Sequence, residues 1–227
     1  MVVRVLRRGF HLGCAPPQVY HPRRPSTAPQ MKGSTLMKHL ALASALLALA
    51  APLALAQTST WKSDPAHSEV GFSITHMSVS NIHGRFGHVD ATVNYNEADV
   101  TKSSVTATID VTGIDTGEDA RNNHLKTADF FDVATYPTAT FTSTAVAKNA
   151  SGLTINGNLT LHGVTKPVVL MADGPRGPAP GMDHKPHAGF SATTTIKRSD
   201  FGIGGKFGPA MVGDDVKLNI DLEVVKQ

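Results

Sequence analysis

The chain has 227 residues, of which 21 are basic and 18 acidic, so its formal net charge is +3. Seven of the basic residues and none of the acidic ones precede Gln57. The later part therefore has 14 basic and 18 acidic residues and a net charge of −4, which excludes nucleic acid as an expected partner because that binding needs a basic face. The single cysteine, Cys14, also precedes Gln57, which excludes a disulfide or a reactive thiol in the later part.

The first 56 residues are interpreted as an extension followed by an export signal. Residues 1–36 are rich in Arg and Pro, and we expect them to be an extension that is disordered or created by a start codon assigned too early. Residues 37–56 begin with a basic group, continue as an apolar run and end in Ala54-Leu55-Ala56, which is the three-part pattern of a secretory signal. Cleavage before Gln57 predicts a periplasmic or secreted domain of residues 57–227.

From residue 69 onward, apolar and polar residues alternate with the period of two that is typical of half-buried strands. We predict a turn at 81–84, a surface loop at 173–186, where Pro and Gly are dense, and a glycine-rich segment at 198–213. Hairpin-like spacing of about eight strands predicts an all-β antiparallel barrel or sandwich. The predicted strands are 69–76, 85–95, 103–111, 138–147, 153–161, 168–171, 190–196 and 216–224.

The segment Thr112–Thr142 interrupts this pattern. It contains a charged run compatible with a helix, Gly117–Lys126, followed by the adjacent aromatic residues Phe130 and Phe131. A helical insertion in an all-β chain needs a structural reason. We predict that it covers one end of a barrel, with at least one of the two Phe side chains turned inward.

No catalytic or nucleotide-binding motif is present, so no cofactor is expected. His184 and His187 could form a metal pair, but a zinc site needs three or four converging ligands, and a solvated loop is the favoured interpretation. His76 falls on the apolar face of its strand, either as a core histidine with a backbone partner or as a ligand contact. Aromatic residues facing small residues fit a filled barrel and a hollow one equally well.

The chain resembles the YceI-like family of periplasmic polyisoprenoid-binding, lipocalin-like proteins from about Trp61 to Lys226. One departure is that Asn122-Asn123 stands where the family commonly has an acidic residue. The resemblance implies an antiparallel lipocalin-like barrel of about eight strands with a short helical insertion, often in a dimer. It also implies an apolar pore for a polyisoprenoid or quinone-precursor-like lipid. The stretches that carry the resemblance are Asp64–His76, Gly84–Phe86, Asp115–Thr116, Arg121–Asp132, Tyr136–Pro137, Gly157–Val168 and Arg198–Ile203.

The expected function is that of an exported, non-enzymatic binding protein that sequesters or carries a long-chain lipid and contacts membranes transiently. The lipid tail is expected along the barrel axis, with its polar head near His76 and Arg121. One alternative is an isomerase or hydrolase with His76 or His124 as general base. Another is a filled barrel that acts through its surface, as a stress or interaction protein. The residues predicted to contact the lipid are Phe72, Ile74, His76, Phe86, Val93, Ile109, Arg121, Phe131, Phe141 and Phe190.

Overall fold

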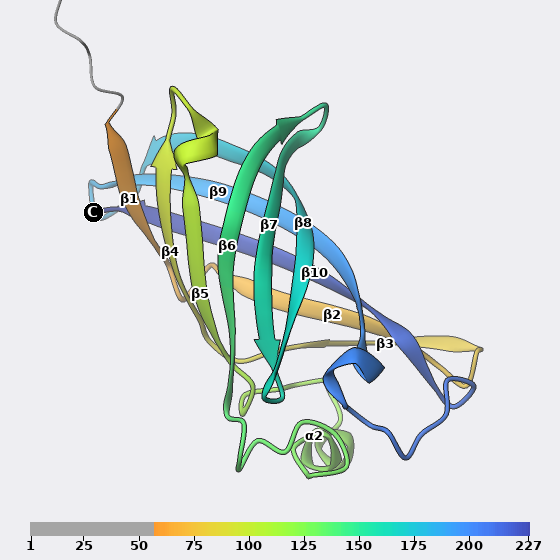
Figure 1. Cartoon of the computed structure of the whole chain (residues 1–227). Coiled ribbons are helices and arrows are strands. Elements are labelled where there is room, and N and C mark those ends of the chain that lie inside the picture. The colour runs from red at the N-terminus through yellow and green to blue at the C-terminus, as the bar shows by residue number, and fades with distance from the viewer. Residues whose placement is uncertain (1–56) are drawn as a thin grey trace, which may run out of the picture. The chain divides into compact units, whose positions relative to one another are not determined.

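Alternating apolar and polar residues build ten β-strands in the computed structural model, which describes residues 57–227 (Figure 1). The predicted extension and export signal lie outside the described residues. One α-helix, α2 (Asp119–Leu125), and two 3₁₀ turns, η1 (Val100–Lys102) and η2 (Arg198–Phe201), complete the described part. The strands are β1 (Thr58–Ser63), β2 (Glu69–His76), β3 (Ser80–Arg85), β4 (Val89–Asn96), β5 (Ser104–Asp110), β6 (Thr138–Asn149), β7 (Gly152–Leu161), β8 (Val164–Pro180), β9 (Pro186–Lys197) and β10 (Val212–Lys226).

All strand pairings are antiparallel, and β1 closes the barrel by pairing with both β4 and β10. β2 continues along the rest of β10, and β3 pairs with β2, so β1–β2 and β3–β4 each form one long, interrupted strand. The ten strands therefore make a closed barrel eight strands around, which confirms the predicted fold. A barrel of about eight strands has an interior that side chains fill or that holds one small ligand.

Near the start of the domain, the sequence analysis missed one strand and made one wrong prediction. The missed strand is β1. The predicted turn at 81–84 is wrong, since these residues form part of β3 and His83 pairs with Ser73 of β2. The turn lies earlier, at Met77 and Ser78, which have positive φ angles of 51° and 58°. β3 is short and largely exposed, so most of its residues are polar, and this polarity suggested a turn.

The predicted surface loop at 173–186 is also wrong. β8 runs to Pro180 and β9 begins at Pro186, so only residues 181–185 connect them. The pairing of β8 with β9 shifts register on either side of Arg176, and such bulges accommodate proline and glycine within a strand. The dense Pro and Gly therefore mark an irregular strand and not a loop.

The barrel interior contains two apolar clusters. The larger surrounds Phe72, Phe130, Phe201 and Leu218 and reaches the helical segment. A smaller one consists of Trp61, Val93, Ala188 and Val224, with Tyr95 and Phe190 packed against it. The smaller cluster therefore fills the barrel interior where β1 meets β10, away from α2.

The predicted insertion forms α2 and its flanking turns, and α2 lies below one end of the strands in Figure 1. Glu118 caps the helix, because its side chain accepts a hydrogen bond from the Ala120 N–H. Among the described residues, β3 pairs with β2 on one side. On its other side it has a single bridge, between Arg85 and Asp115, so the segment that precedes α2 lies there instead of another strand. In the part of the chain from residue 57 onward, no helix has the length and apolar character to cross a membrane.

Candidate functional site

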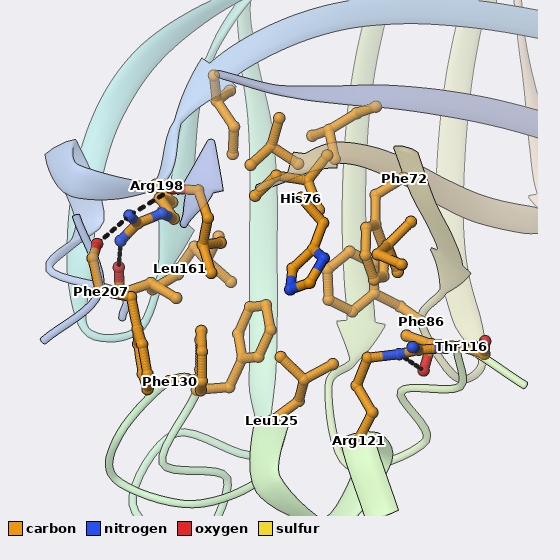
Figure 2. Close-up of a pocket in the computed structure, with 18 of the residues that line it drawn as sticks. Phe72, His76, Phe86, Thr116, Arg121, Leu125, Phe130, Leu161, Arg198 and Phe207 are labelled. Atoms are coloured by element: carbon orange, nitrogen blue, oxygen red, sulfur yellow. Dashed lines mark hydrogen bonds between the residues drawn. The ribbon is translucent and has the colours of Figure 1, made fainter. Parts of the chain in front are cut away.

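A cavity of about 450 Å³ lies inside the barrel at the end near α2 (Figure 2). Residues of β2, β3, β5, β6, β7, β9 and β10 line it, together with the α2 segment and the loop that precedes β10. Its exposed lining residues, Thr75, Ala120, His124 and Met211, mark the mouth. The volume lies within the range typical of small-molecule sites. The predicted residues that line it are Phe72, Ile74, His76, Phe86, Ile109, Arg121 and Phe131.

The other three predicted residues do not line the cavity. Val93 and Phe190 belong to the small cluster that fills the far part of the barrel, where Phe190 lies edge-on to Tyr95 with the ring centroids 6.4 Å apart. Phe141 faces inward, but its ring lies over Gly157 of β7, where a Cβ atom would clash with it. Alternation predicted the face of each residue correctly, but not the level of the barrel at which the cavity ends.

Several lining residues were not predicted as ligand contacts. Phe130, Ile203 and Phe207 come from the insertion and from the glycine-rich segment. Phe130 was available from the sequence as the neighbour of Phe131, and both side chains line the cavity. The glycine-rich segment carried no periodic signal, because its residues follow turns rather than a strand.

An aromatic and ionic contact joins the insertion to the glycine-rich segment. The rings of Phe130 and Phe207 stack with centroids 5.0 Å apart and an interplanar angle of 10°, and His124 lies edge-on to both. Beside them, Lys206 hydrogen-bonds to Asp129, and His124 Nε2 lies 3.3 Å from Asp129 Oδ2. Hydrogen bonds from Lys206 and His124 hold the pKa of Asp129 below its ordinary value. These contacts form one side of the mouth.

The buried side chain of Arg198 binds the backbone of the glycine-rich segment. Its side chain lines the cavity, yet the residue is only 6% exposed. Its five N–H donors all bind backbone carbonyl oxygens, at 2.5–3.0 Å. No carboxylate of the described residues hydrogen-bonds to it. The guanidinium therefore acts as a buried scaffold for the chain around Ile203 and Phe207 (Figure 2). The acceptors are the carbonyls of Ile203, Gly204, Phe207, Val212 and Gly213.

Arg121 lies at the opposite side of the mouth and is half-buried. Its Nε donates to Thr116 Oγ1 at 2.7 Å, and Nη2 donates to the Thr116 carbonyl at 2.9 Å. The cavity lining contains two arginines and, among the described residues, no Asp or Glu. Every donor of Arg198 already binds a backbone carbonyl, so it is Arg121 whose remaining N–H donors are available to a ligand group that accepts hydrogen bonds.

His76 points into the cavity from the end of β2, as Figure 2 shows. The sequence left two interpretations open, a core histidine with a backbone partner and a ligand contact. The structure shows no backbone partner, because the half-buried His76 side chain forms no hydrogen bond with another described residue. Its ring nitrogens are available to a bound molecule.

Asn122 explains how the chain accommodates its departure from the family pattern. Its side-chain oxygen accepts hydrogen bonds from the Thr116 N–H and hydroxyl, and its amide donates to Asp115 Oδ1 at 3.0 Å. A carboxylate at this position could not donate. The Gly117 N–H and then the Asn122 amide hold the pKa of Asp115 below its ordinary value.

Replacing Asn122 by Asp is expected to loosen the start of α2 near neutral pH, because it places a second carboxylate against Asp115. The depressed pKa of Asp115 means that its contribution to stability exists above the unfolded pKa and is lost as the pH falls through the folded pKa. The defect should therefore shrink in acid. Hydrogen exchange should show several-fold faster exchange of the α2 amides near neutral pH. Asn123→Asp adds the same charge at an exposed neighbour and serves as control; equal effects in both variants would contradict the prediction.

The fold and this site together define a lipocalin-like antiparallel β-barrel with an apolar cavity open at one end. A YceI-like domain matches residues 61–224, and the chain belongs to the YceI-like family. It is 41% identical to protein YceI of Salmonella newport over 165 residues, which are 71% of this chain and 83% of that protein.

Two solved structures have the same fold. BcnA of Burkholderia cenocepacia is 30% identical, with a TM-score of 0.60 and coverage of 71% of this chain and 98% of the other. A polyisoprenoid binding domain from Saccharophagus degradans has a TM-score of 0.52 and covers 75% of this chain and all of the other. Its identity is 16%, so that similarity shows the fold alone.

Proposed function

We propose that this protein is an exported binding protein that holds the tail of a polyisoprenoid or similar long-chain lipid in its barrel cavity. The observation that carries the proposal is the cavity itself, which is enclosed by Phe, Leu, Ile and Val side chains and open at one end. Burial of each CH₂ group contributes roughly 0.8 kcal/mol, so a tail with about ten buried carbons gains about 8 kcal/mol before the costs of binding. Shape and dryness are sufficient for such a ligand.

The polar head of the lipid would lie at the mouth, near His76 and Arg121. Both side chains line the cavity and can donate hydrogen bonds, and Arg121 is held in place by Thr116. A head group with oxygen acceptors, such as that of a quinone precursor, matches these donors. No cofactor or catalytic step enters this proposal.

Exposed apolar side chains beside the mouth support transient contact with a membrane. Met77 and Val79, at the tip of the β2–β3 turn, are 59% and 83% exposed, and Met211 is 53% exposed. The Met77 N–H donates to the Met211 carbonyl at 2.8 Å, so the two segments lie together. Apolar side chains that lie together on an exposed surface are suited to contact with lipid, and these three lie beside the mouth. A lipid leaving a bilayer could thus enter the cavity without crossing water.

The proposal includes export, through the predicted signal at residues 37–56, and a homodimer as the expected assembly.

The test is to purify the protein from the export compartment without detergent, extract it with organic solvent and identify the lipids by mass spectrometry. A stoichiometric isoprenoid or acyl lipid is the expected result. An empty extract, together with no uptake of added polyprenyl lipid, would overturn the proposal and favour a barrel that acts through its surface.

One observation favours the enzyme alternative. His124 lines the mouth and has a carboxylate partner in Asp129, which is the arrangement of a general base with an orienting acid. Lys206 also binds the Asp129 carboxylate, so Asp129 is not dedicated to orienting His124. Turnover of small apolar esters or isomerisable lipids by the wild type, abolished in His124→Ala, would establish catalysis.

A further inference from the structure

Two histidines and three carboxylates form a cluster outside the cavity, where the β1–β2 loop meets β9 and β10. Glu223 lies on β10 five residues beyond Leu218, the last residue of β10 that lines the cavity. Five residues of a strand span about 17 Å, so the cluster is separate from the proposed lipid site. Its members are Asp64, His67, Asp183, His187 and Glu223.

Three of these residues bring ligand atoms together. One atom each from Asp64, His67 and Glu223 lies within 4.8 Å of the others, and His67 Nδ1 is 2.9 Å from Asp64 Oδ2. In a tetrahedral zinc site with bonds of about 2.1 Å, ligand atoms are about 3.4 Å apart. Side-chain movements of about 1 Å would therefore suffice to bring these three atoms around one ion.

The backbone already holds the two segments in register. The Asp64 N–H donates to the Glu223 carbonyl at 2.7 Å. The Ser68 hydroxyl donates to the same carbonyl at 3.1 Å and accepts from the Glu223 N–H at 3.2 Å. The Asp64 side chain is 21% exposed and that of His67 is 64% exposed, so the carboxylate is sheltered and the imidazole is open to an incoming ion.

The cluster is also short of positive charge. Among residues 57–227, no lysine or arginine forms a salt bridge with any of its three carboxylates. Added positive charge is thus favoured here, and a divalent ion supplies it. Mixed imidazole and carboxylate ligands suit zinc better than calcium or magnesium, which prefer oxygen alone.

We propose that Asp64, His67 and Glu223 bind one divalent transition metal ion of the zinc type, and that His187 positions Glu223. His187 Nδ1 lies 2.6 Å from Glu223 Oε1, and its Nε2 lies 3.0 Å from Asp183 Oδ1, so it holds the ligand from outside. The ion fastens the β1–β2 loop to β10, three residues from the Trp61–Lys226 pairing that closes the barrel.

The test uses the full protein as purified from cells, stripped with a chelator and titrated with zinc chloride by calorimetry. One zinc per chain and a higher thermal midpoint are expected. His67→Ala and Asp64→Asn should abolish this binding, and His187→Ala should weaken it about 10- to 100-fold. Circular dichroism verifies that each variant is folded. Cobalt in place of zinc should give the visible absorption of a tetrahedral site.

His88→Ala is the matched control, because His88 is an exposed histidine paired with a single carboxylate, Asp90, at 3.1 Å. It should bind zinc as the wild type does. The proposal is overturned if the wild type binds no zinc, if His67→Ala binds as well as the wild type, or if His88→Ala loses binding equally. The proposal is also overturned if calcium binds as tightly as zinc and still binds to His67→Ala, because the carboxylates alone would then bind the ion.

Discussion

Replacing Arg198 by methionine is expected to destabilise the folded protein by about 3–5 kcal/mol. Methionine fills much of the same apolar volume but removes all five donors, leaving the carbonyl oxygens around Ile203 and Phe207 without them. Because Arg198 is 6% exposed, water cannot replace those donors without opening the segment. Chemical denaturation of the wild type and the variant measures the difference.

Arg121→Met is the comparison for this prediction. Arg121 also lines the cavity, but it is half-buried and bonds only Thr116, so its loss should cost about 1 kcal/mol. If the two variants were equally stable, the scaffold role assigned to Arg198 would be wrong. The variant at Arg198 should also retain less lipid, because Ile203, Phe207 and Met211 lose their support.

Replacing Phe131 by aspartate is expected to weaken lipid retention about 100-fold while the barrel stays folded. A phenyl group that a bound lipid covers fully contributes about 1.5–3 kcal/mol of apolar contact, which the variant loses, and a carboxylate facing an apolar cavity adds a desolvation cost. Phe131 packs edge-on against Phe86, with centroids 5.8 Å apart, so its side chain forms part of the cavity wall. The ring is only half-buried, and its backbone hydrogen bond to the Leu125 carbonyl, at 3.0 Å, survives the change.

The measurement is the amount of lipid that co-purifies per protein chain, determined by mass spectrometry, together with circular dichroism to verify the fold. Ala128→Asp places the same charge on the same segment at an exposed residue that does not line the cavity, and it should retain lipid as the wild type does. Unchanged retention in Phe131→Asp would remove this residue from the site.

The strand faces and the helical insertion were predictable because they depend on local patterns. Val70, Phe72, Ile74 and His76 alternate along β2, and all four line the cavity as their shared face predicts. The charged run before Phe130 indicated the helix that became α2. Each of these features follows from the two-residue period of a strand or the composition of a single segment.

Which inward residues meet a cavity, and which fill the barrel, was settled only by the closed fold. Val93 and Phe131 both face inward, yet Val93 packs on Trp61 and Val224, which join it through the pairings of β1 with β4 and β10. His187 likewise meets Glu223 and not a histidine nearby in sequence. Periodicity specifies the direction of a side chain, but the depth of a cavity depends on strand pairings and side-chain volumes distant in the chain, which no local pattern contains.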